Sequence, residues 1–104
     1  MIQTLTPEEA KSLIAQGNVD VVDVREPSEW ARGHIPRSRL VPLAQLRAEP
    51  SAALKADRVI FVCAKGVRSL AAARVAETVG FTELYNLDGG TSGWARAGLP
   101  LIQD

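Results

Sequence analysis

The chain has 104 residues, of which 46 % are hydrophobic and 23 % are charged, a length and composition typical of one compact domain over residues 1–104. Its 12 basic and 12 acidic side chains cancel, which argues against a surface for nucleic acid or anionic membranes. No apolar run approaches the length of a membrane span.

The first predicted helix begins at Thr6-Pro7-Glu8-Glu9, where Thr6 can cap the helix and Glu9 can complete a capping box. Gly17 supplies its C-terminal stop. Residues 19–24 are rich in β-branched side chains, which predicts a strand buried on both faces, as in the middle of a parallel sheet. Three short elements are then expected: a helical turn over 27–33, a strand at 40–41 and a helix over 43–47.

A second buried strand is predicted over 58–62, followed by an alanine-rich helix over 69–79, a strand over 84–87 and a short helix around Trp94. Strands that alternate with helices indicate an α/β fold with parallel strands joined by right-handed crossovers. In such sheets ligands bind beyond the carboxyl ends of the strands. We therefore expect Cys63 and Asp23, each near the end of a buried strand, to lie at one crevice.

The segment Cys63-Ala64-Lys65-Gly66-Val67-Arg68 joins the second buried strand to the alanine-rich helix. A thiol at its first position would face backbone N–H groups, the positive end of a helix dipole and the cations of Lys65 and Arg68. Environments of this kind lower the pKa of a cysteine to roughly 3.5–7.5. We therefore predict that Cys63 is a nucleophile, the alternative being a small buried hydrophobe at a strand end.

The chain has one cysteine and one histidine, which supply at most half of a tetrahedral metal site, so no metal is expected. A single cysteine cannot form an intramolecular disulfide, and the first residues lack a signal-peptide pattern. These observations predict a cytoplasmic protein.

Two further residues, Asp23 and Arg25, are candidates for supporting roles. Asp23 could orient Arg68 or accept hydrogen bonds from loop N–H groups, or it could only cap the end of its strand. Arg25 is expected to make a local ion pair or a hydrogen bond to the backbone. For His34, a structural hydrogen bond to a neighbouring loop is favoured over a general-base role.

Four motifs together resemble the rhodanese domain, specifically a stand-alone single-domain rhodanese, from about Thr6 to Pro100. They are Val22-Asp23-Val24-Arg25-Glu26 with Glu29-Trp30, Gly33-His34-Ile35-Pro36, Cys63-Ala64-Lys65-Gly66-Val67-Arg68-Ser69, and Leu87-Asp88-Gly89-Gly90 followed by Trp94, Gly98 and Pro100. The resemblance implies a five-stranded parallel sheet with helices on both faces. By position, it makes Cys63 the nucleophile and residues Ala64, Lys65, Gly66, Val67 and Arg68 the active-site loop.

The resemblance also implies a ping-pong thiosulfate sulfurtransferase without a metal or organic cofactor. A sulfane sulfur would pass from thiosulfate or a related small anionic donor, through a persulfide on Cys63, to cyanide, a thiol or a protein acceptor. The acceptor must be external because the chain has no second cysteine. We expect a monomer or weak dimer with no nucleic-acid or membrane partner, and a shallow pocket that leaves Cys63 accessible.

The chain departs from the family pattern at two places. Arg37 and Ser38 stand where the family usually has Gly and a small apolar residue, and we interpret this segment as a solvated turn rather than as part of a basic rim with Arg32 and Arg39. Ala64 stands where thiosulfate-using relatives often have Arg, and Lys65 could compensate for the missing charge.

Two other functions compete with sulfur transfer. A non-catalytic binding or regulatory module is one, although inactive rhodanese-like domains usually lack the loop cysteine that is present here. A cysteine-dependent phosphatase or arsenate reductase is the other, but such loops space Cys and Arg by five residues, whereas four residues separate Cys63 from Arg68. The shorter loop favours a smaller reacting atom, namely sulfur.

Overall fold

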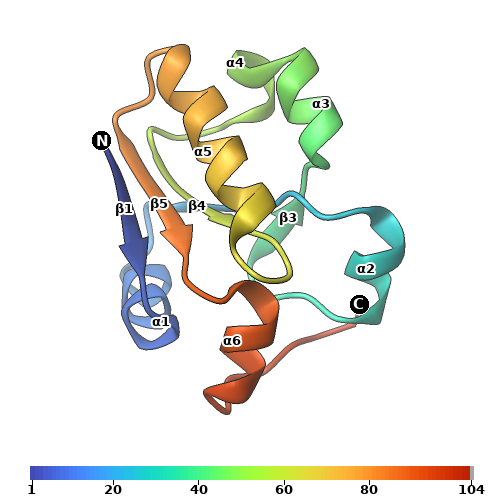
Figure 1. Cartoon of the computed structure of the whole chain (residues 1–104). Helices are drawn as coiled ribbons and strands as arrows, with labels where there is room; N and C mark the ends of the chain where they lie inside the picture. The colour runs from blue at the N-terminus through green and yellow to red at the C-terminus, as the bar shows by residue number, and fades with distance from the viewer. Residues whose placement is uncertain (104) are drawn as a thin grey trace.

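Five parallel strands form one sheet in the order β1-β5-β4-β2-β3 (Figure 1). The computed structural model describes residues 1–103. The strands are β1 (Ile2–Leu5), β2 (Asp20–Asp23), β3 (Ser38–Leu40), β4 (Arg58–Val62) and β5 (Glu83–Leu87). The helices are α1 (Pro7–Gln16), α2 (Pro27–Arg32), α3 (Leu43–Ala48), α4 (Pro50–Ala53), α5 (Val67–Thr78) and α6 (Gly90–Arg96). Within residues 1–103, no helix combines the length and apolar character that crossing a bilayer requires.

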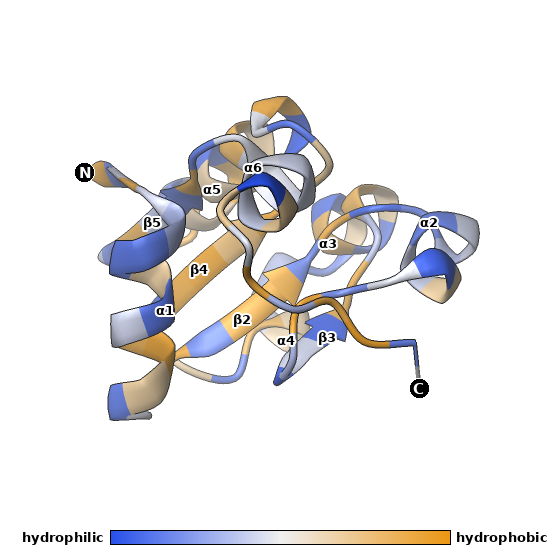
Figure 2. Ribbon diagram, turned by 90° about the horizontal axis from the view of Figure 1, so that it is seen from below, coloured by the Kyte–Doolittle hydropathy of each residue, from blue (hydrophilic) through white to orange (hydrophobic). Residues whose placement is uncertain are grey.

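Helices cover both faces of the sheet, and each face has its own hydrophobic core. Helices α3 and α5 pack on one face, where Val22 and Phe61 meet the small side chains of α5. Helices α1 and α6 contribute to the core on the other face, where Val21 and Ile60 lie near Trp94. Successive residues of a strand point to opposite faces, so strands buried on both sides are largely apolar. In β4 all residues after Arg58 are buried and apolar, and most of its ribbon is hydrophobic in Figure 2.

The observed fold confirms the predicted α/β class, with a five-stranded parallel sheet and helices on both faces. The capping box at the start of α1 is also confirmed, because the side chains of Thr6 and Glu9 each accept a hydrogen bond from the other residue's N–H. Two short elements, β1 and α4, were not predicted from the residue pattern. The strand expected at 40–41 lies instead at Ser38–Leu40, and α5 begins two residues earlier than expected, at Val67.

The carboxyl edge of the sheet brings the predicted crevice residues together. Asp23 is the register partner of Val62, the residue that precedes Cys63. Helix α6 packs against the loop that follows β4, since the N–H of Thr91 donates to the Cys63 carbonyl at 2.8 Å. This approach requires a glycine, because a Cβ atom on Gly90 would lie 2.2 Å from the same carbonyl oxygen.

We predict that Gly90→Ala destabilises the protein strongly. The new methyl group would clash with backbone atoms that cannot move aside, in addition to the strain of an L-residue at a φ of +57°. We expect a loss of roughly 3 kcal/mol in the free energy of unfolding, measured by urea denaturation. The matched control is Gly98→Ala, because Gly98 also has a positive φ of +81° but has no heavy atom within 4 Å of the added position. That variant should lose only about 1 kcal/mol, and equal losses in the two variants would contradict the close approach of α6.

Candidate active site

Cys63 lies at the bottom of a pocket of about 280 Å³ that is lined by the loop after β4 and the first turn of α5. The residue is buried, with 1 % of its surface exposed, so the expectation of an accessible cysteine is wrong. The side chain packs in the hydrophobic core between the sheet and α5, and the Gly66 N–H and the Ser69 hydroxyl lie against the sulfur. The residues that line this pocket are Cys63, Ala64, Lys65, Val67 and Arg68.

The sulfur of Cys63 receives hydrogen bonds from the loop that surrounds it. The N–H of Gly66 donates to Sγ at 3.0 Å, and the hydroxyl oxygen of Ser69 lies 3.3 Å from Sγ. Burial raises the pKa of the Cys63 thiol, but hydrogen bonds from Ser69 and from the N–H groups of Lys65 and Gly66 outweigh it, so the pKa is lowered. The lowered pKa increases the fraction of Cys63 present as thiolate, which is the nucleophilic form of cysteine.

Ser69 connects the sulfur to a second polar residue, Asn86 on β5. The Ser69 hydroxyl donates to Oδ1 of Asn86, and Nδ2 of Asn86 donates to the Gly66 carbonyl at 3.1 Å. A serine hydroxyl has one proton, so it cannot donate to Asn86 and to the sulfur at the same time. The Cys63 thiol can thus donate to Ser69 while Ser69 donates to Asn86, and the Ser69 proton can turn to the sulfur when the thiolate forms.

Neither Ser69 nor Asn86 was among the predicted site residues. Ser69 follows the loop directly and is the last residue of one motif that carries the family resemblance, so the sequence could have indicated it as a site residue. Asn86 is a buried amide in a strand that is otherwise largely apolar, and buried polar side chains are usually held by specific partners.

Arg68 points toward the pocket but does not offer a free positive charge. Its two terminal nitrogens donate to the two carboxylate oxygens of Glu29 on α2, at 2.8 and 2.9 Å. This bidentate pair lowers the pKa of Glu29 to about 2 and raises the pKa of Arg68. Lys65, in contrast, is exposed and has no ion-pair partner within residues 1–103. Among the loop cations, Lys65 therefore carries the charge that remains uncompensated.

Asp23 pairs with Arg25 rather than with Arg68, so of the roles left open for it the structure does not show the orientation of Arg68. Its carboxylate accepts from the backbone N–H of Arg25 at 3.0 Å, which caps the end of β2. The fully buried carboxylate of Asp23 accepts from Nε of Arg25 at 3.0 Å and from Nη2 at 2.8 Å. Arg25 also donates to the Gly33 carbonyl at 2.7 Å, which confirms the predicted local ion pair and backbone hydrogen bond. The pair fixes the segment after β2. Arg25 also lines a neighbouring cavity of about 230 Å³, and Ala64 lines both this cavity and the cysteine pocket.

His34 makes a structural hydrogen bond, as predicted, but its partner is Trp30 in α2 rather than a neighbouring loop. Its Nδ1 lies 3.0 Å from the Trp30 carbonyl, and its ring stacks on the Trp30 indole with centroids 3.5 Å apart. The ring is buried, and it does not line the cysteine pocket.

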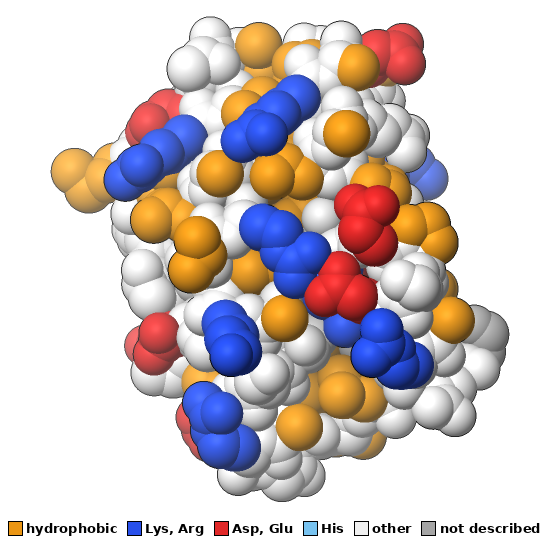
Figure 3. All heavy atoms as spheres, turned by 45° about the vertical axis from the view of Figure 1, so that its right-hand side comes forward, with side chains coloured by type: hydrophobic (Ala, Val, Ile, Leu, Met, Phe, Trp, Pro, Cys, Tyr) orange, Lys and Arg blue, Asp and Glu red, His pale blue; other side chains and the backbone are white. Residues whose placement is uncertain are grey.

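The three arginines near residue 37 have separate partners and do not form one basic rim. Arg39 makes a bidentate ion pair with Asp20, Arg32 donates to the Ser28 carbonyl, and Arg37 donates to the Ile14 carbonyl. On the face shown in Figure 3, basic side chains are spread among acidic and apolar ones rather than gathered in one patch.

We predict that the Glu29–Arg68 pair stabilises the fold in a pH-dependent way. The pKa of Glu29 is lowered from 4.5 to about 2, so its stabilisation is fully present above pH 4.5 and is lost as the pH falls toward 2. Because the Arg68 side chain is 39 % exposed, solvent screening limits the effect of Glu29→Gln to about 1 kcal/mol at neutral pH. The measurement is urea denaturation of both proteins between pH 2 and pH 7.

The control variant is Glu83→Gln, which removes another arginine–carboxylate contact, to Arg58, in a more exposed setting. It should have a smaller effect than Glu29→Gln at neutral pH. A difference between wild type and Glu29→Gln that stays constant from pH 7 to pH 2 would contradict the assigned ion pair.

Comparison with known proteins gives consistent matches across most of the chain. Residues 6–97 match the family described as rhodanese-like domain. The uncharacterized protein YqhL of Bacillus subtilis is 37 % identical over 95 residues, covering 90 % of this chain and 73 % of that protein. The thiosulfate sulfurtransferase GlpE of Pseudomonas aeruginosa is 36 % identical over 92 residues, covering 88 % of this chain and 83 % of that protein. The crystal structure of a rhodanese-related protein from Thermoplasma volcanium superposes with a TM-score of 0.86 at 29 % identity, covering 98 % of this chain and 99 % of that one.

Proposed function

Because this chain belongs to the rhodanese-like domain family, we propose that it is a sulfurtransferase that carries sulfur as a persulfide on Cys63. The observation that supports this most is the setting of the thiol, which is buried yet has a lowered pKa because Ser69 and loop N–H groups bond the sulfur. The same hydrogen-bond donors would stabilise the anionic terminal sulfur of a persulfide. Thiosulfate is the sulfur donor we propose, as the name of the GlpE relative indicates for that protein.

The reaction balances without any oxidant or cofactor. The Cys63 thiolate attacks the outer sulfur of thiosulfate, a new S–S bond forms, and the S–S bond of thiosulfate breaks, so that sulfite leaves with the bonding electron pair. Cyanide or a thiolate then attacks the terminal sulfur of the persulfide, and the Cys63 thiolate leaves from it. The pocket of about 280 Å³ above Cys63 gives room for the small anions that this cycle requires.

We propose that Lys65 attracts the dianionic sulfur donor. Arg68 lines the same pocket, but its charge is balanced by Glu29, and Ala64 supplies no charge. The exposed ammonium of Lys65 thus provides an uncompensated positive charge at the pocket, which attracts the anion from solution.

The burial of Cys63 favours a small acceptor. Cyanide or a low-molecular-weight thiol can enter a pocket of this size, whereas a cysteine on a folded protein would have to reach a residue with 1 % exposure. A protein acceptor would therefore need an extended segment or a displacement of the loop.

We predict that incubation of the reduced protein with thiosulfate adds the mass of one sulfur atom, measured by intact-protein mass spectrometry. Cyanide should remove that mass and release thiocyanate. Cys63→Ser should gain no mass and form no thiocyanate, because the chain has no other thiol. Full sulfur transfer by Cys63→Ser would contradict the proposed function.

Two lysine variants in the same experiment test the source of donor attraction. Lys65→Gln should still form the persulfide, but with a KM for thiosulfate raised roughly two- to ten-fold because one charge contact is lost. Lys55→Gln makes the same chemical change at another exposed position outside the cysteine pocket and should leave KM unchanged. Equal KM values for thiosulfate in the two variants would contradict the proposal that Lys65 attracts the sulfur donor.

A further inference from the structure

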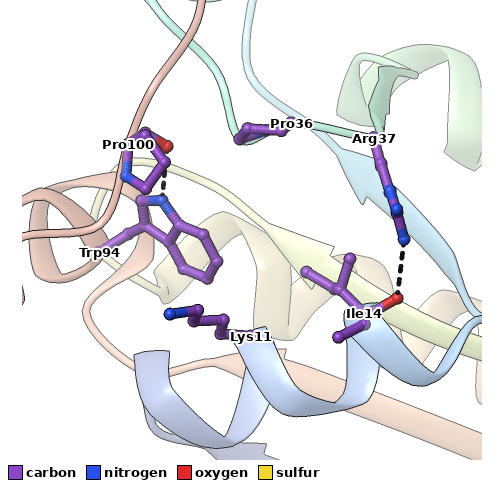
Figure 4. A pocket seen from close by; sticks show the side chains of 7 residues that line it. Lys11, Ile14, Pro36, Arg37, Trp94 and Pro100 are labelled. Atoms are coloured by element: carbon purple, nitrogen blue, oxygen red, sulfur yellow. Dashed lines mark hydrogen bonds between the residues drawn. The ribbon is translucent and has the colours of Figure 1, made fainter.

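A third cavity, of about 210 Å³, lies between α1, the turn after residue 35 and the start of the C-terminal segment (Figure 4). Its surface is almost entirely apolar, and none of its lining residues lines the cysteine pocket. This volume is below the roughly 300–1,000 Å³ of pockets for drug-sized ligands, so the cavity suits a smaller molecule. The residues drawn and labelled around it are Lys11, Ile14, Pro36, Arg37, Trp94 and Pro100.

The apolar walls are flat and firmly held. The Trp94 indole is buried, and its Nε1–H donates to the Pro100 carbonyl at 2.8 Å, which fixes the ring against the C-terminal segment. In Figure 4 the ring of Pro36 lies across the cavity from Ile14. Proline rings and an indole offer flat apolar surfaces, on which a planar ligand can pack with little loss of conformational entropy.

Two cations lie at the edges of this apolar surface, and neither is neutralised. Lys11 and Arg37 have no carboxylate partner within residues 1–103, and the Arg37 side chain makes one hydrogen bond, from Nη1 to the Ile14 carbonyl at 3.3 Å. The remaining N–H groups of Arg37 stay available to a ligand. The two cations lie on opposite sides of the cavity (Figure 4), so a single negative head can pair with only one of them. The guanidinium of Arg37 can hold a carboxylate through two hydrogen bonds, so an apolar body with a carboxylate head complements the cavity and Arg37.

The backbone of Arg37 adds an independent observation. Its φ is +71°, a left-handed conformation that costs an L-residue roughly 1–2 kcal/mol and that glycine adopts freely. An arginine at this position is therefore strained, and its side chain borders the cavity. Strained positions of this kind cluster at binding sites, where the side chain rather than the backbone is needed.

We propose that this cavity binds a small aromatic carboxylate, with the ring between Trp94 and Pro36 and the carboxylate on Arg37. This site lies outside the sulfur-transfer pocket, and its occupant is not a reactant of the proposed reaction.

The test is a titration of the isotope-labelled full chain with naphthalene-2-carboxylate, followed by ¹H–¹⁵N NMR. The indole N–H signal of Trp94 reports on the cavity, and that of Trp30, whose ring stacks on His34, serves as an internal control. Naphthalene-2-carboxamide has the same ring system without the charge. We expect saturable shifts at Trp94 and not at Trp30, with a Kd for the carboxylate several-fold lower than for the amide.

Three variants assign the carboxylate to Arg37. Arg37→Gly should raise the Kd for the carboxylate roughly two- to five-fold, whereas Lys11→Gln, on the opposite side of the cavity, should change it less. Arg37→Gly is expected to fold normally, because glycine suits a φ of +71°. Arg47→Gln removes an exposed arginine from α3 and should leave the Kd unchanged. Absence of saturable shifts at Trp94, equal affinity for carboxylate and amide, or unchanged affinity in Arg37→Gly would overturn the proposal.

Discussion

The pairing of the loop carbonyls after β4 is the interaction on which the rest of the site depends. The carbonyls of Cys63 and Ala64 accept from the N–H groups of Thr91 and Ser92 at the start of α6, and the carbonyl of Gly66 accepts from Asn86. Because these carbonyls are paired outward, the loop can turn N–H groups inward toward the sulfur. A buried thiolate without such donors would be strongly disfavoured by desolvation.

The charges around the loop follow from the same packing. One buried pair, Asp23–Arg25, holds the chain after β2, and a second pair, Glu29–Arg68, ties α2 to the first turn of α5. Both pairs bring cations close to the active-site loop while cancelling most of their charge. The groups that hydrogen-bond the sulfur, Ser69 and the Gly66 N–H, are thus the ones that stabilise its negative charge. Lys65, which lines the pocket, is the one that attracts the anionic sulfur donor.

Much of this arrangement could be predicted from the sequence, because it depends on short runs of neighbouring residues. Apolar, β-branched runs marked β2 and β4, and their ends placed Cys63 and Asp23 at one edge of the sheet. Strand β1 was missed because four residues give little periodicity, and this strand is defined by its pairing with β5, far along the chain. The partner of Arg68 was missed for a similar reason, since Glu29 lies 39 residues away and the contact depends on how α2 packs. The burial of Cys63 likewise results from the packing of its side chain in the core between the sheet and α5, which a local pattern does not contain.

The measurement that tests this account most directly is the pKa of the Cys63 thiol, followed by the ultraviolet absorbance of the thiolate across a pH titration. Wild type should titrate below the ordinary value of 9.0, despite the burial of the residue. Ser69→Ala should raise the pKa, because it removes a hydrogen bond that lowers it. A wild-type midpoint at or above 9.0 would show that burial outweighs the loop's hydrogen bonds and would contradict the claim that these bonds stabilise the anionic form of the Cys63 sulfur.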